Sequence, residues 1–225
     1  MPSWITHLVT AKKIKHQEEE NEFIFANIMP DILEGYNVQE VSKIVRDYQT
    51  HYPKKQEING ITIPVPDIQK FKEQYREKLQ NPIIKGYYCH LLTDYYWNTY
   101  TYENYFESYK KEEDLVKIRL NKGEEKILKW DEAVRIKQRD FKNFTKYLKD
   151  KEKITIPYYD LKIREYSKDL IEFEYTEADI KNTIFSIQKM LKNQEKEEKE
   201  YQLFTKEELV KKLEESVLFI EEKLI

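Results

Sequence analysis

Residues 82–97 read PIIKGYYCHLLTDYYW, the most apolar and aromatic stretch of the chain. Proline suits the first turn of a helix, where its missing N–H has no helical partner to lose. The apolar residues that follow recur at helical spacing and form a wide stripe, which is typical of a helix buried over much of its circumference. We therefore expect a central, buried helix from Pro82 to about Tyr105.

The rest of the chain also favours helices. Only 4 of the 225 residues are Gly and 7 are Pro, which argues against a turn-rich β-sandwich or barrel. A short apolar segment, Phe23–Met29, is expected to stop at Pro30. The turn sequences Asn59-Gly60 and Asn121–Gly123 each predict a small β-hairpin. Helical spacing predicts further helices at residues 4–16, 38–48, 67–79, 131–148, 159–171, 177–190 and 205–224.

The predicted fold class is therefore all-α, and a chain of this length is expected to form a single helical domain, 1–225. Lys and Arg total 39 against 42 Asp and Glu, so the chain lacks the basic footprint of a non-specific nucleic-acid binder. The single cysteine, Cys89, excludes an internal disulfide and a cysteine-rich zinc module. We find no signal-type apolar core and no stretch long enough to cross a bilayer, and we expect a cytoplasmic protein.

A histidine and an aspartate stand four residues apart within the central stretch. His90 and Asp94 would project from one face of the helix, about one turn apart, and can together bind a divalent metal ion. Such a pair is more often a helix salt bridge. Here the flanking residues are almost uncharged, and a buried ionisable pair is costly unless it is paired or bound to metal. Gly86, one turn earlier, permits close approach of a neighbouring helix or a ligand.

Four other positions have ordinary explanations when each is taken singly. Asp31, three residues before Glu34, matches a helix capping box. His51 follows an expected helix and can interact with its terminal carbonyls. His7 lies among apolar neighbours, as a core histidine does, and His16 beside an acidic run is expected on the surface.

Taken together, these residues resemble the zinc-dependent phospholipase C family. The motifs occur in the family's order within residues 3–98: Thr6-His7, Pro30-Asp31, Thr50-His51 and Gly86-x3-His90-x3-Asp94-x2-Trp97. The family includes bacterial phospholipases C and the N-terminal domain of glycosylphosphatidylinositol-specific phospholipase D, and single-strand nucleases are more distant relatives. The resemblance implies a multi-helix phospholipase C/nuclease-like domain. Its metal-site core would lie in residues 1–110, and residues 111–225 would supply a hairpin and the C-terminal helices.

The resemblance also implies a set of metal ligands. A principal ion would be held by Asp31, His51, His90 and Asp94, and Asp94 would bridge to a second ion beside His7. We expect one or two zinc ions, although two carboxylates with two imidazoles also accept manganese or iron. No histidine follows His90, so the family's third ion is absent or its site is rebuilt from acidic residues such as Glu103, Asp131, Glu132 or Asp140.

These residues support competing functions. The first hypothesis is a metal-dependent hydrolase of a small phosphate-ester substrate, in which metal-activated water attacks phosphorus and Asp31 is catalytic, as a ligand or general base for that water. The alternative is a non-catalytic helical binding or structural protein that retains a degenerate metal site. A nucleotide phosphohydrolase of the histidine–aspartate class would normally require an adjacent His-Asp pair, which this sequence lacks. The sequence makes no strong case for a nucleic-acid partner and does not specify an oligomeric state.

Overall fold

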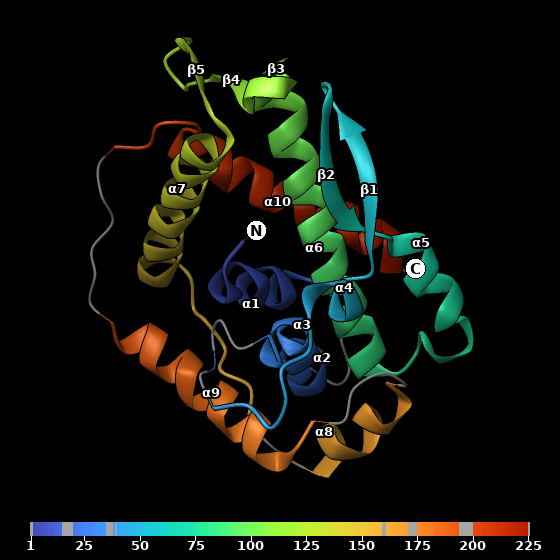
Figure 1. Cartoon of the computed structure of the whole chain (residues 1–225). Coiled ribbons are helices and arrows are strands. Elements are labelled where there is room, and N and C mark those ends of the chain that lie inside the picture. The colour runs from blue at the N-terminus through green and yellow to red at the C-terminus, as the bar shows by residue number, and fades with distance from the viewer. Residues whose placement is uncertain are drawn as a thin grey trace.

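The computed structural model describes residues 2–14, 20–34, 38, 40–158, 161–170, 175–193 and 200–224, so His16 lies outside it. The described chain is mostly helical with two small antiparallel sheets, as the composition predicted (Figure 1). The α-helices are α1 (Trp4–Lys13), α2 (Glu20–Ala26), α3 (Met29–Ile32), α4 (Asp47–Thr50), α5 (Ile68–Gln74), α6 (Pro82–Tyr105), α7 (Trp130–Lys151), α8 (Leu161–Tyr166), α9 (Glu177–Lys192) and α10 (Lys206–Leu224). The strands are β1 (Pro53–Ile58), β2 (Ile61–Pro66), β3 (Phe106–Lys110), β4 (Leu115–Arg119) and β5 (Glu125–Lys129).

The long helix α6 has the predicted bounds and runs through the middle of the molecule. Pro82 occupies its first turn, and the Asn81 side chain caps it by accepting a hydrogen bond from the Ile83 backbone N–H at 2.8 Å. Most of the first half of the helix is buried, including both His90 and Asp94. This helix therefore carries two polar side chains into the interior on a rigid element.

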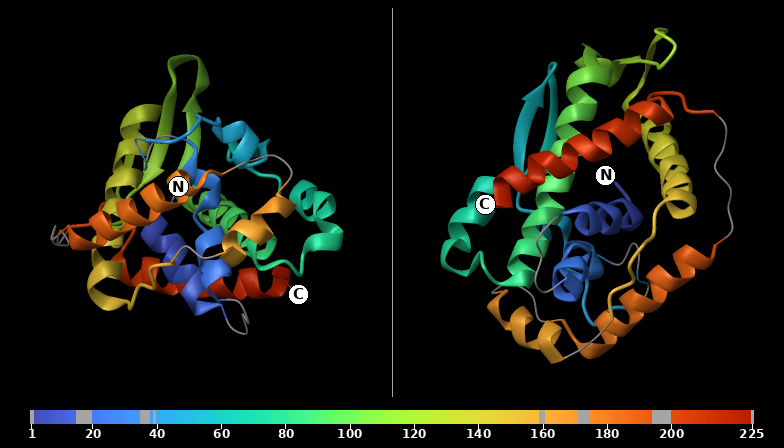
Figure 2. Two further views of the ribbon diagram at one scale, coloured as in Figure 1. Left: turned by 90° about the horizontal axis from the view of Figure 1, so that it is seen from below. Right: turned by 180° about the vertical axis from the view of Figure 1, so that it is seen from behind.

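The first three helices lie inside a ring of later ones. Figures 1 and 2 show α1, α2 and α3 enclosed by α6, α7, α8 and α9, with α10 crossing behind. The closest packing is between α2 and α6 at Gly86. A Cβ atom at this position would lie 2.3 Å from the Phe23 carbonyl oxygen and 2.6 Å from the Ala26 Cβ atom, so only glycine permits this approach. Of the two alternatives for Gly86, the structure therefore shows the close approach of a neighbouring helix, α2.

The first hairpin is confirmed and is longer than its turn alone indicated. Strands β1 and β2 pair from Ile58 with Ile61 out to Pro53 with Pro66. At the turn, Asn59 and Gly60 both have positive φ angles, 49° and 76°, as a type I′ turn requires. The prolines in β2 are tolerated because a two-stranded sheet consists only of edge strands.

The second hairpin is also present, but it belongs to a three-stranded sheet in the order β3-β4-β5. Strands β4 and β5 form the predicted pair around Gly123, which has a φ of 82°. The third strand was not predicted. It leaves the end of α6 directly at Phe106 and pairs with β4, and Asp114 adopts a left-handed conformation at the turn between them.

One predicted helix is wrong. Residues 40–46 have no helical structure, and only the short helix α4 follows them. Ile44, which the helical pattern counted as apolar, is 74% exposed. The segment is held instead by tertiary bonds: the Val45 N–H donates to the Leu33 carbonyl, and the Ser42 hydroxyl donates to Asp179 on α9. Pro30 does not end α2, which stops at Ala26, but lies in the first turn of α3.

Two apolar clusters form the core. The first surrounds α2 and the first half of α6 and includes Phe23, Leu91 and Ile220. The second lies between α7, α10 and the sheets and includes Ile5 and Phe141. Each cluster therefore combines residues from before and after residue 110. None of the described helices is long and apolar enough to cross a lipid bilayer.

Candidate metal centre

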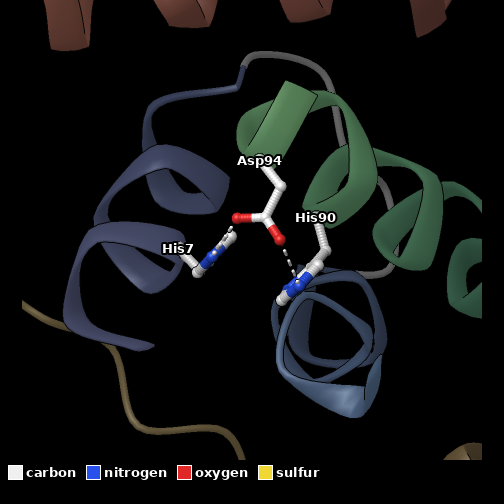
Figure 3. A group of neighbouring side chains, drawn as sticks. All are labelled: His7, His90 and Asp94. Carbon is white, nitrogen blue, oxygen red and sulfur yellow. Dashed lines mark ion pairs between the residues drawn. The ribbon is translucent and has the colours of Figure 1, made fainter. Parts of the chain in front are cut away.

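Five buried polar side chains meet where α1, α3, α4 and α6 approach one another. His7 comes from α1, Asp31 from α3, His51 from the residue after α4, and His90 and Asp94 from successive turns of α6. Figure 3 shows Asp94 between His7 and His90. The structure thus brings together the five residues expected to hold the first two ions, across more than eighty positions of chain.

Four of these residues point one atom each at a common point. His51 Nε2 lies 3.1 Å from His90 Nε2, 3.2 Å from Asp31 Oδ1 and 3.5 Å from Asp94 Oδ2. His90 Nε2 lies 3.4 Å from Asp94 Oδ2 and 3.8 Å from Asp31 Oδ1. Five of the six separations among these four atoms are therefore below 4 Å, and the side chains form two overlapping groups suited to a metal ion, Asp31-His51-His90 and His7-His90-Asp94.

These five separations have the length expected between neighbouring ligands of a zinc ion. Bonds of about 2.0–2.2 Å from zinc to nitrogen and oxygen place neighbouring ligand atoms about 3.3–3.6 Å apart. The five measured separations run from 3.1 to 3.8 Å and so bracket that value. Two imidazoles with two carboxylates also match the chemistry of zinc, manganese and iron. The donor set and its dimensions both fit a divalent metal ion.

The His90 ring is oriented by the end of α2. Its Nδ1 atom lies 2.8 Å from the Asn27 backbone carbonyl oxygen. A carbonyl can only accept a hydrogen bond, so Nδ1 must carry the proton, and the neutral ring then has its lone pair on Nε2. This Nε2 atom is the one that faces the other three donors, as in metal-binding histidines whose second nitrogen donates to a fixed acceptor.

The His51 ring is oriented by Glu34 and Thr50. The sequence pattern favoured Glu34 as a capping residue and predicted no role for Thr50. Its Nδ1 atom lies 3.1 Å from Glu34 Oε1 and 2.8 Å from the Thr50 hydroxyl oxygen. The capping-box interpretation of Asp31 and Glu34 is therefore wrong, because Asp31 lies inside α3 and the cap position is Ile28. Their spacing of three residues instead places one carboxylate near each nitrogen of the His51 ring. The three-residue spacing of Asp31 and Glu34 was the signal in the sequence that could have identified this arrangement.

Asp94 is a buried carboxylate without an aligned donor. It is 0% exposed, and neither oxygen accepts a hydrogen bond from any residue in the described part of the chain. The nearest imidazole nitrogens, of His7 and His90, lie at ion-pair distances of 3.3 Å and 3.4 Å. Such a group is costly to bury unless a cation is close.

The charges at the centre depend on one another. Burial acts to raise the pKa of Asp94, but the His90 and His7 rings outweigh it and hold the pKa well below the usual value. Burial acts to lower the pKa of His90, but the Asp31 and Asp94 carboxylates outweigh it and raise the pKa. The pKa of Asp31 is likewise lowered, because His90 and His51 overcome the effect of burial. The electrostatics of the cluster thus favour a positive charge between the carboxylates.

His7 lies beside the four converging donors. Its ring stacks on His90 with centroids 3.9 Å apart and planes 7° from parallel, and its Nε2 atom lies 3.3 Å from Asp94 Oδ1. Burial, followed by the nearby His90, lowers the pKa of His7, which keeps the ring neutral. A second ion here would have His7 and the outer oxygen of Asp94 as its protein ligands.

The acidic residues suggested for a third ion are used elsewhere. Asp131 forms an ion pair with Arg135, and Glu132 accepts a hydrogen bond from the Lys129 backbone N–H at the start of α7. Asp140 accepts backbone hydrogen bonds from residues 202–204. Glu103 lines a surface groove beside β3. In the part of the chain that the structure describes, the groups suited to a metal contain none of these four residues.

The cluster is least buried at Asp31. Its side chain is 12% exposed, whereas those of His90 and Asp94 are 0% exposed and that of His51 is 4% exposed. Asp31 is therefore the ligand nearest to the solvent-accessible surface.

Comparisons with protein-family models, with curated proteins and with solved structures find no match for this chain.

Proposed function

We propose that this protein is a metal-dependent hydrolase of phosphate esters, with its ion held by Asp31, His51, His90 and Asp94. One observation carries the proposal: donor atoms from three separate segments gather around His51 and His90 at separations of 3.1–3.8 Å, close to those between neighbouring ligands of a zinc ion. Each of the two histidines has an acceptor for its other nitrogen. A salt-bridge network would need no such convergence.

The order of the ligands along the chain supports a phospholipase C/nuclease-like arrangement, which we propose as the finer description of the fold. Ligands arrive from the first helix, a short helix beginning Met-Pro-Asp, the end of another short helix, and two successive turns of the long central helix. This is the order that the sequence resemblance implies for the family's inner metal ligands. Zinc is the proposed ion, and manganese and iron suit the same donors.

The chemistry divides between the ion and the chain. When bound, such an ion lowers the pKa of a coordinated water toward about 7 and offsets charge on a phosphoryl oxygen. We assign to Asp31, the least buried of the proposed ligands, the orientation of the attacking water and the acceptance of its proton. Asp94 and His90 stay fixed on the rigid helix α6 and keep the site in position. A small phosphate ester is the substrate class that this arrangement suits.

A second candidate function is a structural metal site, and the burial of the ligands favours it. Four protein donors complete a tetrahedron, and sites closed in that way are typically structural, whereas catalytic sites leave one position open. His90 and Asp94 have no exposed surface. In this case the ion would stabilise the junction of α3, α4 and α6 and would catalyse nothing.

The test combines metal analysis with a small substrate panel. Purified protein is assayed for bound zinc, manganese and iron, and then for hydrolysis of p-nitrophenyl phosphate and bis-p-nitrophenyl phosphate, before and after chelation and zinc return. The hydrolase predicts stoichiometric metal and a chelator-sensitive rate that Asp94→Asn abolishes. Bound metal and metal-dependent stability without hydrolysis of either ester would favour the structural site. Protein that binds no metal would contradict both.

A further inference from the structure

We propose that Glu34 is a positioning residue that fixes the His51 ring as a ligand and so sets how tightly the centre holds its ion. The inference rests on the metal centre of the proposed function and assigns a role to a residue outside the ligand set. Glu34 does not face the converging donor atoms. It lies behind His51, on the side of the ring away from them.

The geometry places His51 between two carboxylates of one short segment. Asp31 Oδ1 lies 3.2 Å from His51 Nε2, and Glu34 Oε1 lies 3.1 Å from His51 Nδ1. A proton on Nδ1, which lies 2.8 Å from the Thr50 hydroxyl oxygen and 3.1 Å from Glu34 Oε1, leaves the Nε2 lone pair facing the ion. A carboxylate behind a histidine ligand fixes the ring orientation and makes the ligand more basic.

Thr50 ties this arrangement to the central helix. Its hydroxyl donates to Glu34 Oε1 at 3.0 Å and lies 2.8 Å from His51 Nδ1. Its backbone carbonyl accepts a hydrogen bond from the Tyr87 hydroxyl, on α6, at 2.7 Å. The support for His51 is thus anchored to the same helix that carries His90 and Asp94.

His51 needs this support more than His90 does. His90 stands in the middle of a 24-residue helix, whereas His51 follows a helix of only four residues. Behind His90 lies a neutral backbone carbonyl, whereas behind His51 the Thr50 hydroxyl, 2.8 Å from Nδ1, lies together with the Glu34 carboxylate, 3.1 Å from Nδ1. Interactions with ionised groups are stronger than those between neutral groups. The charged group therefore lies behind the less rigid ligand.

The burial of Glu34 agrees with such a role. Its side chain is only 8% exposed, and among the described residues it has no Lys or Arg within ion-pair distance. Buried carboxylates are rare unless they are partnered. The partners that the structure gives to Glu34 are the Thr50 hydroxyl and the His51 ring.

The experiment measures metal binding, without any assay of activity. Zinc affinity is determined by competition with a chromophoric chelator for the wild type, Glu34→Ala, Glu34→Gln and Asp179→Asn. Asp179 is the matched control, because it is also a buried carboxylate bonded to hydroxyl groups, those of Ser42 and Thr176. The visible spectrum of the cobalt-substituted proteins reports ligand geometry at the ion.

Glu34→Ala should weaken zinc binding by about 10- to 100-fold, the usual effect of removing a partner behind a metal ligand. Glu34→Gln should lose only about 5-fold, because its carbonyl oxygen still accepts the Nδ1–H without the charge. Asp179→Asn should bind zinc as the wild type does. The cobalt spectrum should change in Glu34→Ala and stay the same in Asp179→Asn.

The outcomes separate this inference from the proposed function. A wild type that binds no zinc overturns both. A wild type that binds zinc, with unchanged affinity in Glu34→Gln and Glu34→Ala, overturns only the role of Glu34. If Glu34→Ala does not fold, Glu34→Gln decides, since unchanged affinity in that variant also overturns the role. A loss of affinity in Asp179→Asn equal to that in Glu34→Ala shows a general effect of lost stability and overturns it as well.

Discussion

Asp94 and Asp140 are both buried aspartates on long helices, and their surroundings are opposite. Both are 0% exposed. Asp140, on α7, accepts backbone hydrogen bonds from Gln202, Leu203 and Phe204 at 2.7–3.1 Å. Asp94, on α6, accepts no backbone hydrogen bond from any described residue and is approached by three imidazole rings.

The difference between the two aspartates shows that the groups around a buried carboxylate determine its role. Three backbone N–H groups satisfy Asp140 permanently, so it clamps the segment before α10 onto α7 and needs no cation. Imidazole rings can stabilise the Asp94 carboxylate only if a ring nitrogen that faces it carries a proton, or if an ion lies between the ring and the carboxylate. Burial alone does not distinguish a clamp from a metal ligand, but the identity of the donors does.

The largest expected effect comes from removing the ion. An ion present at about 1,000 times its dissociation constant contributes about 4 kcal/mol, which for a chain of this size corresponds to roughly 8–16 °C in melting temperature. Chelator should lower the melting temperature of the wild type by that amount. Asp94→Asn should abolish the response, and Asp140→Asn should keep it. Calorimetry of the three proteins with and without chelator measures this. An equal response in both variants would contradict the different roles of Asp94 and Asp140.

Asp140→Asn should destabilise the protein without changing its affinity for the metal ion. All three backbone N–H groups reach Oδ2 and can bond to the amide oxygen, but each then loses the negative charge of its acceptor, at a total cost of about 2–3 kcal/mol. Denaturant unfolding at saturating zinc gives this loss, and zinc affinity should match that of the wild type. A fall in zinc affinity would mean that the two carboxylates are coupled.

Lys137 extends the comparison to a buried cation. Its ammonium group donates to the Tyr102 hydroxyl at 2.9 Å and has no carboxylate within ion-pair distance among the described residues. Burial lowers its pKa to about 8, and the field of Asp94 opposes the shift only in part. Between pH 8 and about 10.5 the unfolded chain binds a proton that the folded protein does not, so stability rises with pH in that window.

Lys137→Met should therefore gain about 1–2 kcal/mol at pH 7, after loss of the hydrogen bond to Tyr102, and the gain should shrink as pH approaches 10. Urea unfolding of both proteins at pH 7, 8.5 and 9.5 measures it. A stability difference that does not change with pH would contradict a lowered pKa for Lys137.

The smallest effect is a reversal of the pH dependence when the metal is removed. In the metal-free protein the pKa of His90 is raised above 6.5, so the stability that protonated His90 contributes is present below that pH and is lost as pH rises through the raised value. In the loaded protein, acid protonates the ligands and releases the ion, so stability falls as pH drops. Melts from pH 5.5 to 8, with and without chelator, should slope in opposite directions by about 1 kcal/mol. Parallel slopes would show that no ion is bound.

Prediction from the sequence succeeded for elements with strong local patterns. It failed for segments whose conformation is set by tertiary contacts. Helix α6 and the Asn59-Gly60 turn followed from periodicity and turn chemistry. The helix expected at residues 38–48 is absent, because bonds to Leu33 and Asp179 hold residues 42–45 in another path. Strand β3 lacks a pattern of its own and exists because β4 pairs with it.

At the centre, the five nominated side chains do converge, and the resemblance to a known family drew attention to them. The residues behind the ligands were not predictable. Glu34 resembled a capping residue, and the acceptor of His90 is a backbone carbonyl, which no residue type encodes. Such partners depend on which turns of chain lie next to each other, and local spacing carries no information on that.

Gly86 shows how far this dependence reaches. Its missing Cβ lets the Phe23 carbonyl approach α6, and one turn further along both helices the Asn27 carbonyl meets His90 Nδ1. A glycine with no chemistry of its own therefore determines which nitrogen of a histidine is protonated. In a screen that scores variants by zinc retention, replacements at Gly86 should group with those at the ligands, and a catalogue of metal-binding residues compiled from side chains alone would omit it.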